Sequence, residues 1–309
     1  MSVHVTPTSV RHVLDEHVEE ARFVWLQRCA AVSAPNFSPR QFADLDERLE
    51  AHIDGLRVAG AVGWNLAQEA LDSGEAEDFF PASVLAIEDP GQRFEYILTR
   101  AFATQRVVAA VISALGWVDP KFLSGRVKSL LSDASPFRQM LGIAACAVHR
   151  KDPGPPLETG LTSAAPVVRS RALRTAGELG RADLLPRVLS AVDDQKAEAR
   201  FWACRSAVLL GNRGKAIDAL IAIMLKPGAR QLQALQLVLQ AVDVERGHDL
   251  LTQSTDLPNA NRLRVIGSGF VGASNYAPWL IEQMSDPMLA RVAAEAFVNI
   301  TGADFNLNQ

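Results

Sequence analysis

The stretch VRSRALRTAGELGRADLLPRVLSAVDD, residues 168–194, decides the fold of this chain. Its first half repeats small and apolar residues at the spacing i, i+3, i+4 and i+7, which marks one buried face of a helix. That helix is expected to stop at Leu179-Gly180, because glycine readily supplies a left-handed C-cap. A shorter second helix follows, with a proline close to its start. The stretch therefore predicts a helical hairpin.

The hairpin recurs with a period of about 31 residues. Steps of this length from Val107 reach Arg138, Arg169, Arg200, Gln231 and Arg262. Three and four residues after each marker, the positions are apolar or glycine: Ala110–Val111, Leu141–Gly142, Ala172–Leu173, Ala203–Cys204, Ala234–Leu235 and Val265–Ile266. One further period brings Ala296, Phe297 and Ile300 into register, although the copy around Arg291 is slipped by a residue or two.

A single hairpin cannot bury its own apolar face, so several hairpins must stack side by side. Further glycine turns are expected at Leu115-Gly116, Leu210-Gly211, Val271-Gly272 and Thr301-Gly302. Second helices are expected in DPKFLSGRVKSLLSD, GKAIDALIAIML and APWLIEQMSD. The fold class predicted from this pattern is all-α, a right-handed α-solenoid of helical hairpins that occupies residues 104–309.

The first third of the chain lacks the repeat and predicts a different set of helices. SVRHVLDEHVEEARFVWLQRCAAV is expected to form one long amphipathic helix, and SPRQFADLDERLEAHIDGLRVAG a second. Ser38 is the expected N-cap of the second helix, Pro39 lies in its first turn and Gln41 completes a capping box. Residues 1–103 are therefore predicted to be a helical cap over the exposed end of the first repeat.

Two resemblances add to this interpretation. PVVRSRALRTAGELGRADLLPRVLSAVDD and the closing AEAFVNITGADF resemble the short bacterial HEAT-like repeat of phycobilisome-lyase-type proteins, over roughly residues 104–305. LDERLEAHIDGLRVAGAVGW, joined to such an array, also resembles a proteobacterial HEAT-repeat family whose genes often lie beside type VI secretion components and effectors. That second resemblance implies an immunity, chaperone or adaptor role for a secreted effector.

Composition and charge narrow the classes of protein further. The 309 residues are 48% hydrophobic, enough for a large core. Residues 1–95 carry 17 acidic and seven basic side chains, whereas residues 96–309 carry 18 acidic and 24 basic ones. This asymmetry indicates either different partners for the two parts or ordinary solvated surface. The start MSVHVTPTSV lacks a secretory pattern, and no run reaches the roughly 20 apolar residues of a membrane span, so we expect a cytoplasmic protein without membrane association.

No motif for catalysis, a cofactor or a metal stands out, and we expect none of the three. GxSxG and P-loop patterns are missing. His12 and His17 lie five positions apart, which separates them by about 140° around a helix, so they are badly placed to share a metal. Cys29, Cys146 and Cys204 form no CxxC pair, which favours buried structural thiols over a disulfide or zinc site.

The recurring arginines allow two interpretations. As a structural ladder, Arg138, Arg200, Arg262 and Arg291 would pair with Asp133, Asp194, Asp256 and Asp286 just upstream. Arg171 and Arg174 fall outside that ladder. Together with Arg169, Arg187, Arg205 and Arg264 they would form either a cationic strip for an acidic partner or phosphate backbone, or merely a solvated surface.

The short second helices are expected to line a concave groove that grips a partner. The residues predicted to project into it are Phe122, Arg126, Arg187, Asp218 and Trp279. Arg171 and Arg174, from the cationic strip, are further candidates for partner binding. Trp117, Trp202 and Trp279 are each either a partner contact or packing between repeats.

The function predicted from these features is a non-enzymatic protein-binding scaffold, with a secreted effector or toxin as its partner. The first alternative is a nucleic-acid-binding or DNA-glycosylase-like protein, although nucleic acid is the less favoured partner. The second is a chromophore-lyase-like enzyme. The final repeat has no evident second helix, so either the tail folds over its apolar edge, the chain self-associates there, or the full protein is longer.

Overall fold

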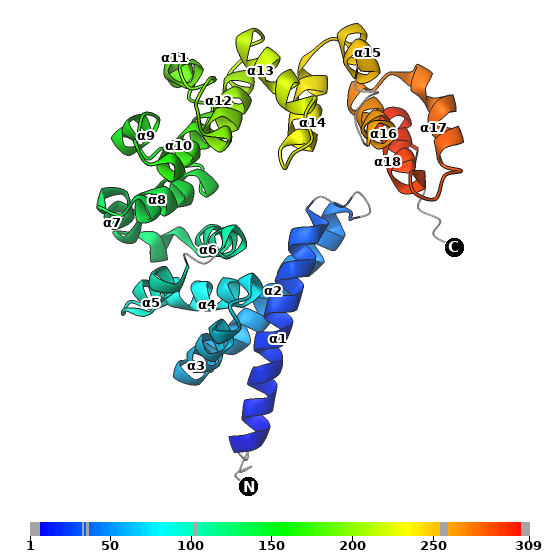
Figure 1. Ribbon diagram of the computed structural model, residues 1–309. Helices are drawn as coiled ribbons and strands as arrows, with labels where there is room; N and C mark the ends of the chain where they lie inside the picture. Colours follow the sequence, from blue (N-terminus) through cyan, green and yellow to red (C-terminus); the bar gives the residue numbers. More distant parts are fainter. Residues whose placement is uncertain (1–6, 33, 35–36, 102–103, 254–258, 304–309) are drawn as a thin grey trace. The chain divides into compact units, whose positions relative to one another are not determined.

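A computed structural model describes residues 7–32, 34, 37–101, 104–253 and 259–303 of the chain. Every regular element in these ranges is a helix, as predicted (Figure 1). The helices pack in consecutive hairpins, and the fold is an α-solenoid. The chain divides into two compact units, Met1–Pro153 and Gly154–Gln309. The boundary predicted after residue 103 marks where the repeat begins, whereas the division into two compact units falls after Pro153. The boundary at residue 103 stays a prediction.

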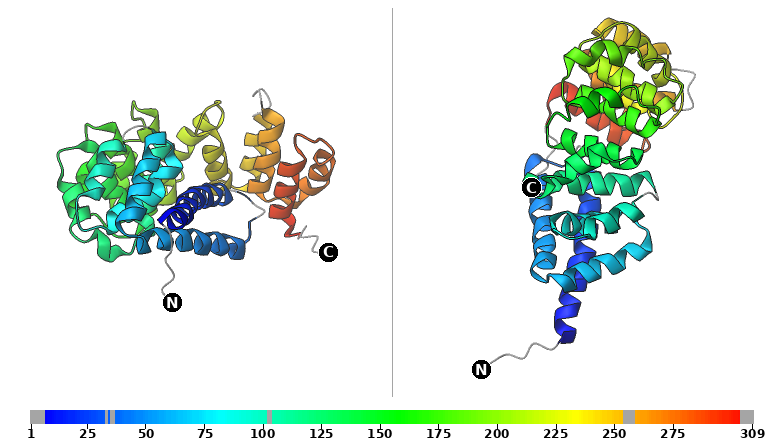
Figure 2. Two further views of the ribbon diagram at one scale, coloured as in Figure 1. Left: turned by 90° about the horizontal axis from the view of Figure 1, so that it is seen from below. Right: turned by 90° about the vertical axis from the view of Figure 1, so that its left-hand side faces the viewer.

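The first unit begins with two long helices that lie side by side (Figures 1 and 2). These are α1 (Pro7–Ala31) and α2 (Pro39–Val58). The predicted capping box of α2 is confirmed: the Gln41 backbone N–H donates to Ser38 Oγ (3.3 Å), and the Ser38 backbone N–H donates to Gln41 Oε1 (2.9 Å). Shorter helices follow: α3 (Ala61–Ala70), α4 (Ala76–Glu88) and α5 (Arg93–Arg100).

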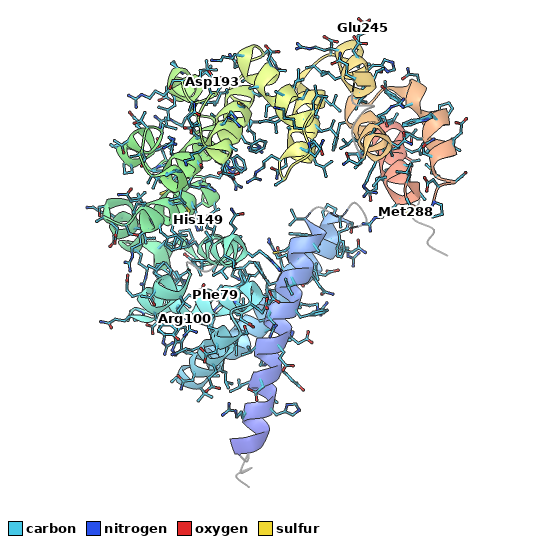
Figure 3. The ribbon with its side chains drawn as sticks, in the orientation of Figure 1. Phe79, Arg100, His149, Asp193, Glu245 and Met288 are labelled. Atoms are coloured by element: carbon cyan, nitrogen blue, oxygen red, sulfur yellow. The ribbon has the colours of Figure 1, made fainter. Side chains whose placement is uncertain are left out.

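Helix α4 is the centre of the first unit. It packs against α1 and against α6 (Gln105–Trp117), and nearly all of its residues are buried, Phe79 among them (Figure 3). The 3₁₀ turn η2 (Pro120–Leu123), α7 (Arg126–Ser132) and α8 (Pro136–Val148) complete the unit. The glycine turn expected at Leu115-Gly116 is wrong, because α6 continues through Gly116 to Trp117.

Two histidines meet between α1 and α2. His17 Nδ1 lies 3.0 Å from His52 Nδ1, and the ring centroids are 5.3 Å apart. Only one nitrogen of such a pair can carry the shared proton, so charging both rings opposes the contact. Burial, followed by the charges of His17 and Arg48, lowers the pKa of His52 below its ordinary value of 6.5, while Glu20 acts in the opposite direction.

This histidine contact predicts a pH-dependent stability of the α1–α2 hairpin. The folded-state pKa of His52 lies below the unfolded value. The contribution of neutral His52 to the free energy of unfolding is therefore present above about pH 6.5, and it is lost as the pH falls through the folded pKa. Hydrogen exchange of α2 amides, corrected for intrinsic rates, should therefore show less protection at pH 5 than at pH 7. His52→Gln should reduce this difference, whereas His12→Gln, at an exposed position on α1, should not. Equal pH dependence in both variants would contradict the prediction.

The second unit repeats a long helix followed by a short one. Its long helices are α10 (Pro166–Glu178), α12 (Ala197–Leu209), α14 (Gln231–Ala241), α16 (Ala260–Val271) and α18 (Ala290–Thr301). The short row comprises α9 (Pro155–Gly160), α11 (Leu185–Leu189) after the 3₁₀ turn η3 (Ala182–Leu184), α13 (Lys215–Met224), α15 (Val244–Gln253), and α17 (Ala277–Gln283) after η5 (Ser274–Tyr276).

The predicted period is confirmed by burial. The residues three positions after the markers, namely Ala110, Leu141, Ala172, Ala203, Ala234 and Val265, are all fully buried. Four of the expected C-terminal glycines, Gly180, Gly211, Gly272 and Gly302, adopt a positive φ, where a side chain would be strained. In the last copy, Ala296 is buried while Phe297 and Ile300 pack against the same C-terminal core cluster.

The two rows of the second unit lie on opposite sides of its curve. The short helices occupy the convex side, where Figure 3 labels Asp193 after α11 and Glu245 on α15. The long helices form the opposite row (Figure 1). The prediction that the short second helices line a concave groove is therefore wrong for this unit, and the arginine-bearing long helices take that place.

Candidate functional site

Three arginine side chains surround one tryptophan ring on the long-helix row of the second unit. The guanidinium carbon of Arg174, from α10, lies 4.5 Å from the centre of the Trp202 ring, on α12. The corresponding distances are 5.5 Å for Arg205, on α12, and 5.0 Å for Arg230, which precedes α14. We call the group formed by Arg171, Arg174, Glu178, Glu198, Trp202, Arg205 and Arg230 the arginine–tryptophan cluster.

The repeat period brings this cluster together. Arg174 and Arg205 occupy equivalent positions one period apart, and so do Arg171 and Trp202. Because α10 and α12 pack closely along their length, equivalent residues become neighbours. Arg230 reaches the ring from the next repeat and also covers Phe201, at 5.1 Å from the centre of that ring.

Two carboxylates hold part of the cluster in place. Glu178 accepts hydrogen bonds from Arg171 (2.5 Å) and Arg174 (2.6 Å). Glu198 accepts one from Trp202 Nε1 (2.7 Å) and forms an ion pair with Arg230. These bonds fix the tryptophan ring and orient the guanidinium groups that stack on it.

Arg205 is the exception within the cluster. In the part of the chain that the structure describes, no carboxylate oxygen lies within 4.0 Å of its guanidinium group. Burial, followed by the charge of Arg174, lowers the pKa of Arg205, although Glu178 opposes this effect. The cluster thus contains four arginines and two glutamates, and it has an excess of positive charge.

Arg171, predicted as a partner contact, lies beneath the surface. Its side chain is only 7% exposed, and its Nε donates to Thr175 Oγ1 (3.1 Å) while its Nη2 donates to Glu178. Burial is the main cause that lowers the pKa of Arg171, to about 10, which still leaves it charged at neutral pH. In this position Arg171 anchors Glu178, and its role as a partner contact stays a prediction. Arg174 is 42% exposed, and its role as a partner contact stays a prediction.

The candidates on the short helices do not join the cluster. Arg187, on α11, pairs with Glu158 at 3.1 Å, and Asp218, on α13, pairs with Arg246 at 3.3 Å. Both pairs bridge neighbouring short helices on the convex side of the unit. Whether a partner contacts them stays a prediction.

Trp279 belongs to the last hairpin. It packs against the C-terminal core cluster, its ring centre lies 6.3 Å from that of Tyr276, and Arg264 approaches the ring at 5.4 Å. The same hairpin exposes Ile281 (54%) and Met288 (80%, labelled in Figure 3). Self-association through this edge stays a prediction.

Phe122 and Arg126 come together in the first unit. Both line a pocket of about 810 Å³ between α5 and α7. Arg126 lies 5.7 Å from the ring centre of Phe94 and donates to the backbone carbonyl of Asp89. Lys121 stacks on Phe122 at 4.9 Å. Two of the candidate residues predicted from the sequence thus line the same pocket. Whether they contact a partner stays a prediction.

The predicted arginine–aspartate ladder is only partly present. Arg138 lies 3.5 Å from the upstream Asp133, as expected, but its closer partner is Glu95 at 2.5 Å. Arg169 pairs at 2.6 Å with Asp194, which lies downstream rather than upstream.

The remaining positions of the ladder differ from the prediction. Arg200 donates to the backbone carbonyl of Asp194 (3.2 Å), and Arg262 donates to the carbonyl of Met288 (3.3 Å). Asp256 lies outside the described residues. Arg291 pairs with Glu295 (3.0 Å) on its own helix rather than with Asp286.

Two of the three cysteines lie in the core. Cys146 and Cys204 are buried, as expected, and burial raises the pKa of Cys204 to about 11. Cys29 is exposed, contrary to the expectation of three buried thiols. Across the described ranges, no group of three or more His, Cys, Asp or Glu side chains is placed to hold a metal ion. None of the helices described there has the length and hydropathy needed to cross a bilayer.

Sequence reasoning named Arg174 and Arg205 but missed how Glu178, Glu198 and Arg230 complete the site. The i, i+4 spacing of Arg174 and Glu178 was a usable signal for one of these contacts. No local pattern relates Arg230 to Glu198, since 32 residues separate them.

Comparison with known proteins supports the repeat assignment. A family model of HEAT repeats matches residues 154–240, the segment from α9 to α14 that carries the whole cluster. Repeats of this kind are generally scaffolds for protein interaction. A comparison with curated proteins finds no match.

Proposed function

We propose that this chain is a scaffold that binds an acidic segment of another protein at the arginine–tryptophan cluster. The observation that carries the proposal is the packing of Arg174, Arg205 and Arg230 around Trp202, with Arg205 lacking a carboxylate partner among the described residues. HEAT repeats over the same segment support a role in protein binding.

The geometry suits carboxylate recognition. A guanidinium group stacked on an aromatic ring keeps its N–H donors directed outward from its edge, where they can form two parallel hydrogen bonds to a carboxylate. Holding the arginines in place before binding reduces the entropy lost when a partner arrives. Tryptophan and arginine are also the residue types most often found at the energetic centre of protein interfaces.

The partner class that we propose is a secreted bacterial effector, with this chain as its immunity protein, chaperone or adaptor. The support is the resemblance of LDERLEAHIDGLRVAGAVGW, followed by a repeat array, to the family encoded beside type VI secretion genes. Co-expression with the products of neighbouring effector genes should yield a stable stoichiometric complex by native mass spectrometry. Isolation of this chain alone from every such co-expression would count against the effector as partner.

The binding surface is tested by charge reversal. Tagged wild-type protein, an Arg174→Glu/Arg205→Glu variant and an Arg187→Glu/Arg246→Glu control would each be used to capture proteins from a bacterial lysate, with quantitative mass spectrometry. The control changes the same number of charges on the short-helix row. We expect specific partners to be lost from the cluster variant and retained by the control.

The alternative outcomes of this test are distinct. Loss of the same partners from the control but not from the cluster variant would assign binding to the short helices. Binding of a labelled DNA duplex, steeply weakened by salt and abolished in the cluster variant, would favour the nucleic-acid hypothesis instead. Nothing in the described part of the chain favours a chromophore-lyase or DNA-glycosylase activity over protein binding.

A further inference from the structure

A pocket adjoins the arginine–tryptophan cluster. It has a volume of about 540 Å³ and lies where α12, α13 and the start of α14 meet. Its apolar wall is formed by Val192, Phe201, Ala219, Ala222, Ile223 and Pro227. The volume lies within the range of roughly 300–1,000 Å³ that is typical of ligand pockets. The wall can therefore accept an apolar side chain and exclude water from it.

The pocket and the cluster share two side chains, Glu198 and Arg230, and Phe201 contacts both groups. Phe201, Glu198 and Arg230 line the pocket and also take part in the contacts around Trp202. Arg230 stacks between the two, at 5.1 Å from the centre of Phe201 and 5.0 Å from the centre of Trp202. A ligand that fills the pocket would therefore lie next to the guanidinium groups of the cluster.

The rim of the pocket, like the cluster, carries positive charges that form no ion pair with a carboxylate among the described residues. Asp193, labelled in Figure 3, is already paired with Lys215. Arg200 donates to the backbone carbonyl of Asp194. Among the described residues, no carboxylate oxygen lies within 4.0 Å of the Lys226 ammonium group. The rim thus complements an anionic ligand, as the cluster does.

We infer that the pocket and the arginine–tryptophan cluster form one composite site for an extended protein segment in which an apolar side chain lies directly beside acidic residues. The apolar side chain enters the pocket, and the neighbouring carboxylates bind Arg230, Arg205 and Arg174. Pocket burial supplies affinity, while the requirement for adjacent carboxylates supplies specificity. This inference rests on the proposed function, because it places the acidic segment on the same arginines.

Selection from a randomised twelve-residue peptide display library on the immobilised full chain tests the inference. We expect enriched peptides to share one large apolar residue with acidic residues on one or both sides. Fluorescein-labelled copies of these peptides would then be titrated with the wild-type protein and with three variants. Ala222→Trp fills the pocket from an exposed position, Ala182→Trp adds the same ring at an exposed position away from it, and Arg174→Glu/Arg205→Glu reverses the cluster.

The inference expects Ala222→Trp and the cluster variant each to weaken binding by about tenfold or more, and Ala182→Trp to leave it unchanged. Far-UV circular dichroism would confirm that all variants remain helical. Loss of binding in the cluster variant alone would overturn the composite site while leaving the proposed function intact. Loss in Ala222→Trp alone would overturn both. Enrichment of peptides without the acidic–apolar pairing, or of none, would also overturn the inference.

Discussion

The Trp202→Ala variant is expected to destabilise the second unit by about 3–5 kcal/mol. The ring is only 7% exposed and packs edge-to-face on Phe201, with centroids 5.1 Å apart. Its removal leaves a cavity between α10 and α12 and takes away the face on which three arginines stack. Hydrogen exchange of the slowest amides in α10 and α12 is the appropriate measurement, because it reports the free energy of opening within the second unit itself.

Trp202→Phe is the matched control for this prediction. It keeps an aromatic face for the arginines but removes the Nε1 donor to Glu198. The expected loss is smaller, about 1–2 kcal/mol. If Trp202→Ala reduced the free energy of opening no more than Trp202→Phe does, the ring would not be the packing centre that the structure shows.

A second large effect is expected from Gly177→Val. Gly177 lies where α10 passes close to α12: a Cβ atom at this position would lie 2.7 Å from the Cβ and 2.8 Å from the backbone Cα of Ser206. Ser206 has little freedom to move, because it is fully buried and its hydroxyl donates to the Leu173 carbonyl (2.7 Å). The helices must therefore separate, at a cost of about 3 kcal/mol. The thermal unfolding midpoint and amide exchange in α10 measure this loss.

Gly228→Val provides the comparison for the glycine substitution. A Cβ at Gly228 would meet no atom within 4 Å, so the change in stability should stay within about 0.5 kcal/mol. Similar losses in the two variants would show that the cost comes from removing glycine in general and not from the approach of α10 to α12.

The repeat could be predicted from the sequence because its signals are local. Small and apolar residues at Ala172, Leu173 and Ala203 fall at helical spacing, and the glycines that end the helices follow at a constant distance. Gly116 shows the limit of such signals. A helix end is predicted there, yet α6 continues through Gly116 to Trp117.

The candidate site was only partly predictable. Arg171 and Arg174 are three residues apart on one helix and look equivalent in the sequence, yet one is buried and the other partly exposed. In the folded chain, Arg171 lies under the surface and donates to Thr175 and Glu178, whereas Arg174 stacks on Trp202 with part of its side chain exposed. Contacts between repeats of this kind depend on the angle and separation of whole helices, which no spacing along one helix encodes.

The sequence by itself thus determined the class of fold, the period of the hairpins and the positions of most helix ends, since these follow from burial and capping within about 30 residues. Only the tertiary structure decided which row of helices takes the concave side, and which arginines share Glu178 and Glu198 around Trp202. Those features depend on packing between repeats, where side chains 25 to 32 residues apart compete for the same partners and the same space.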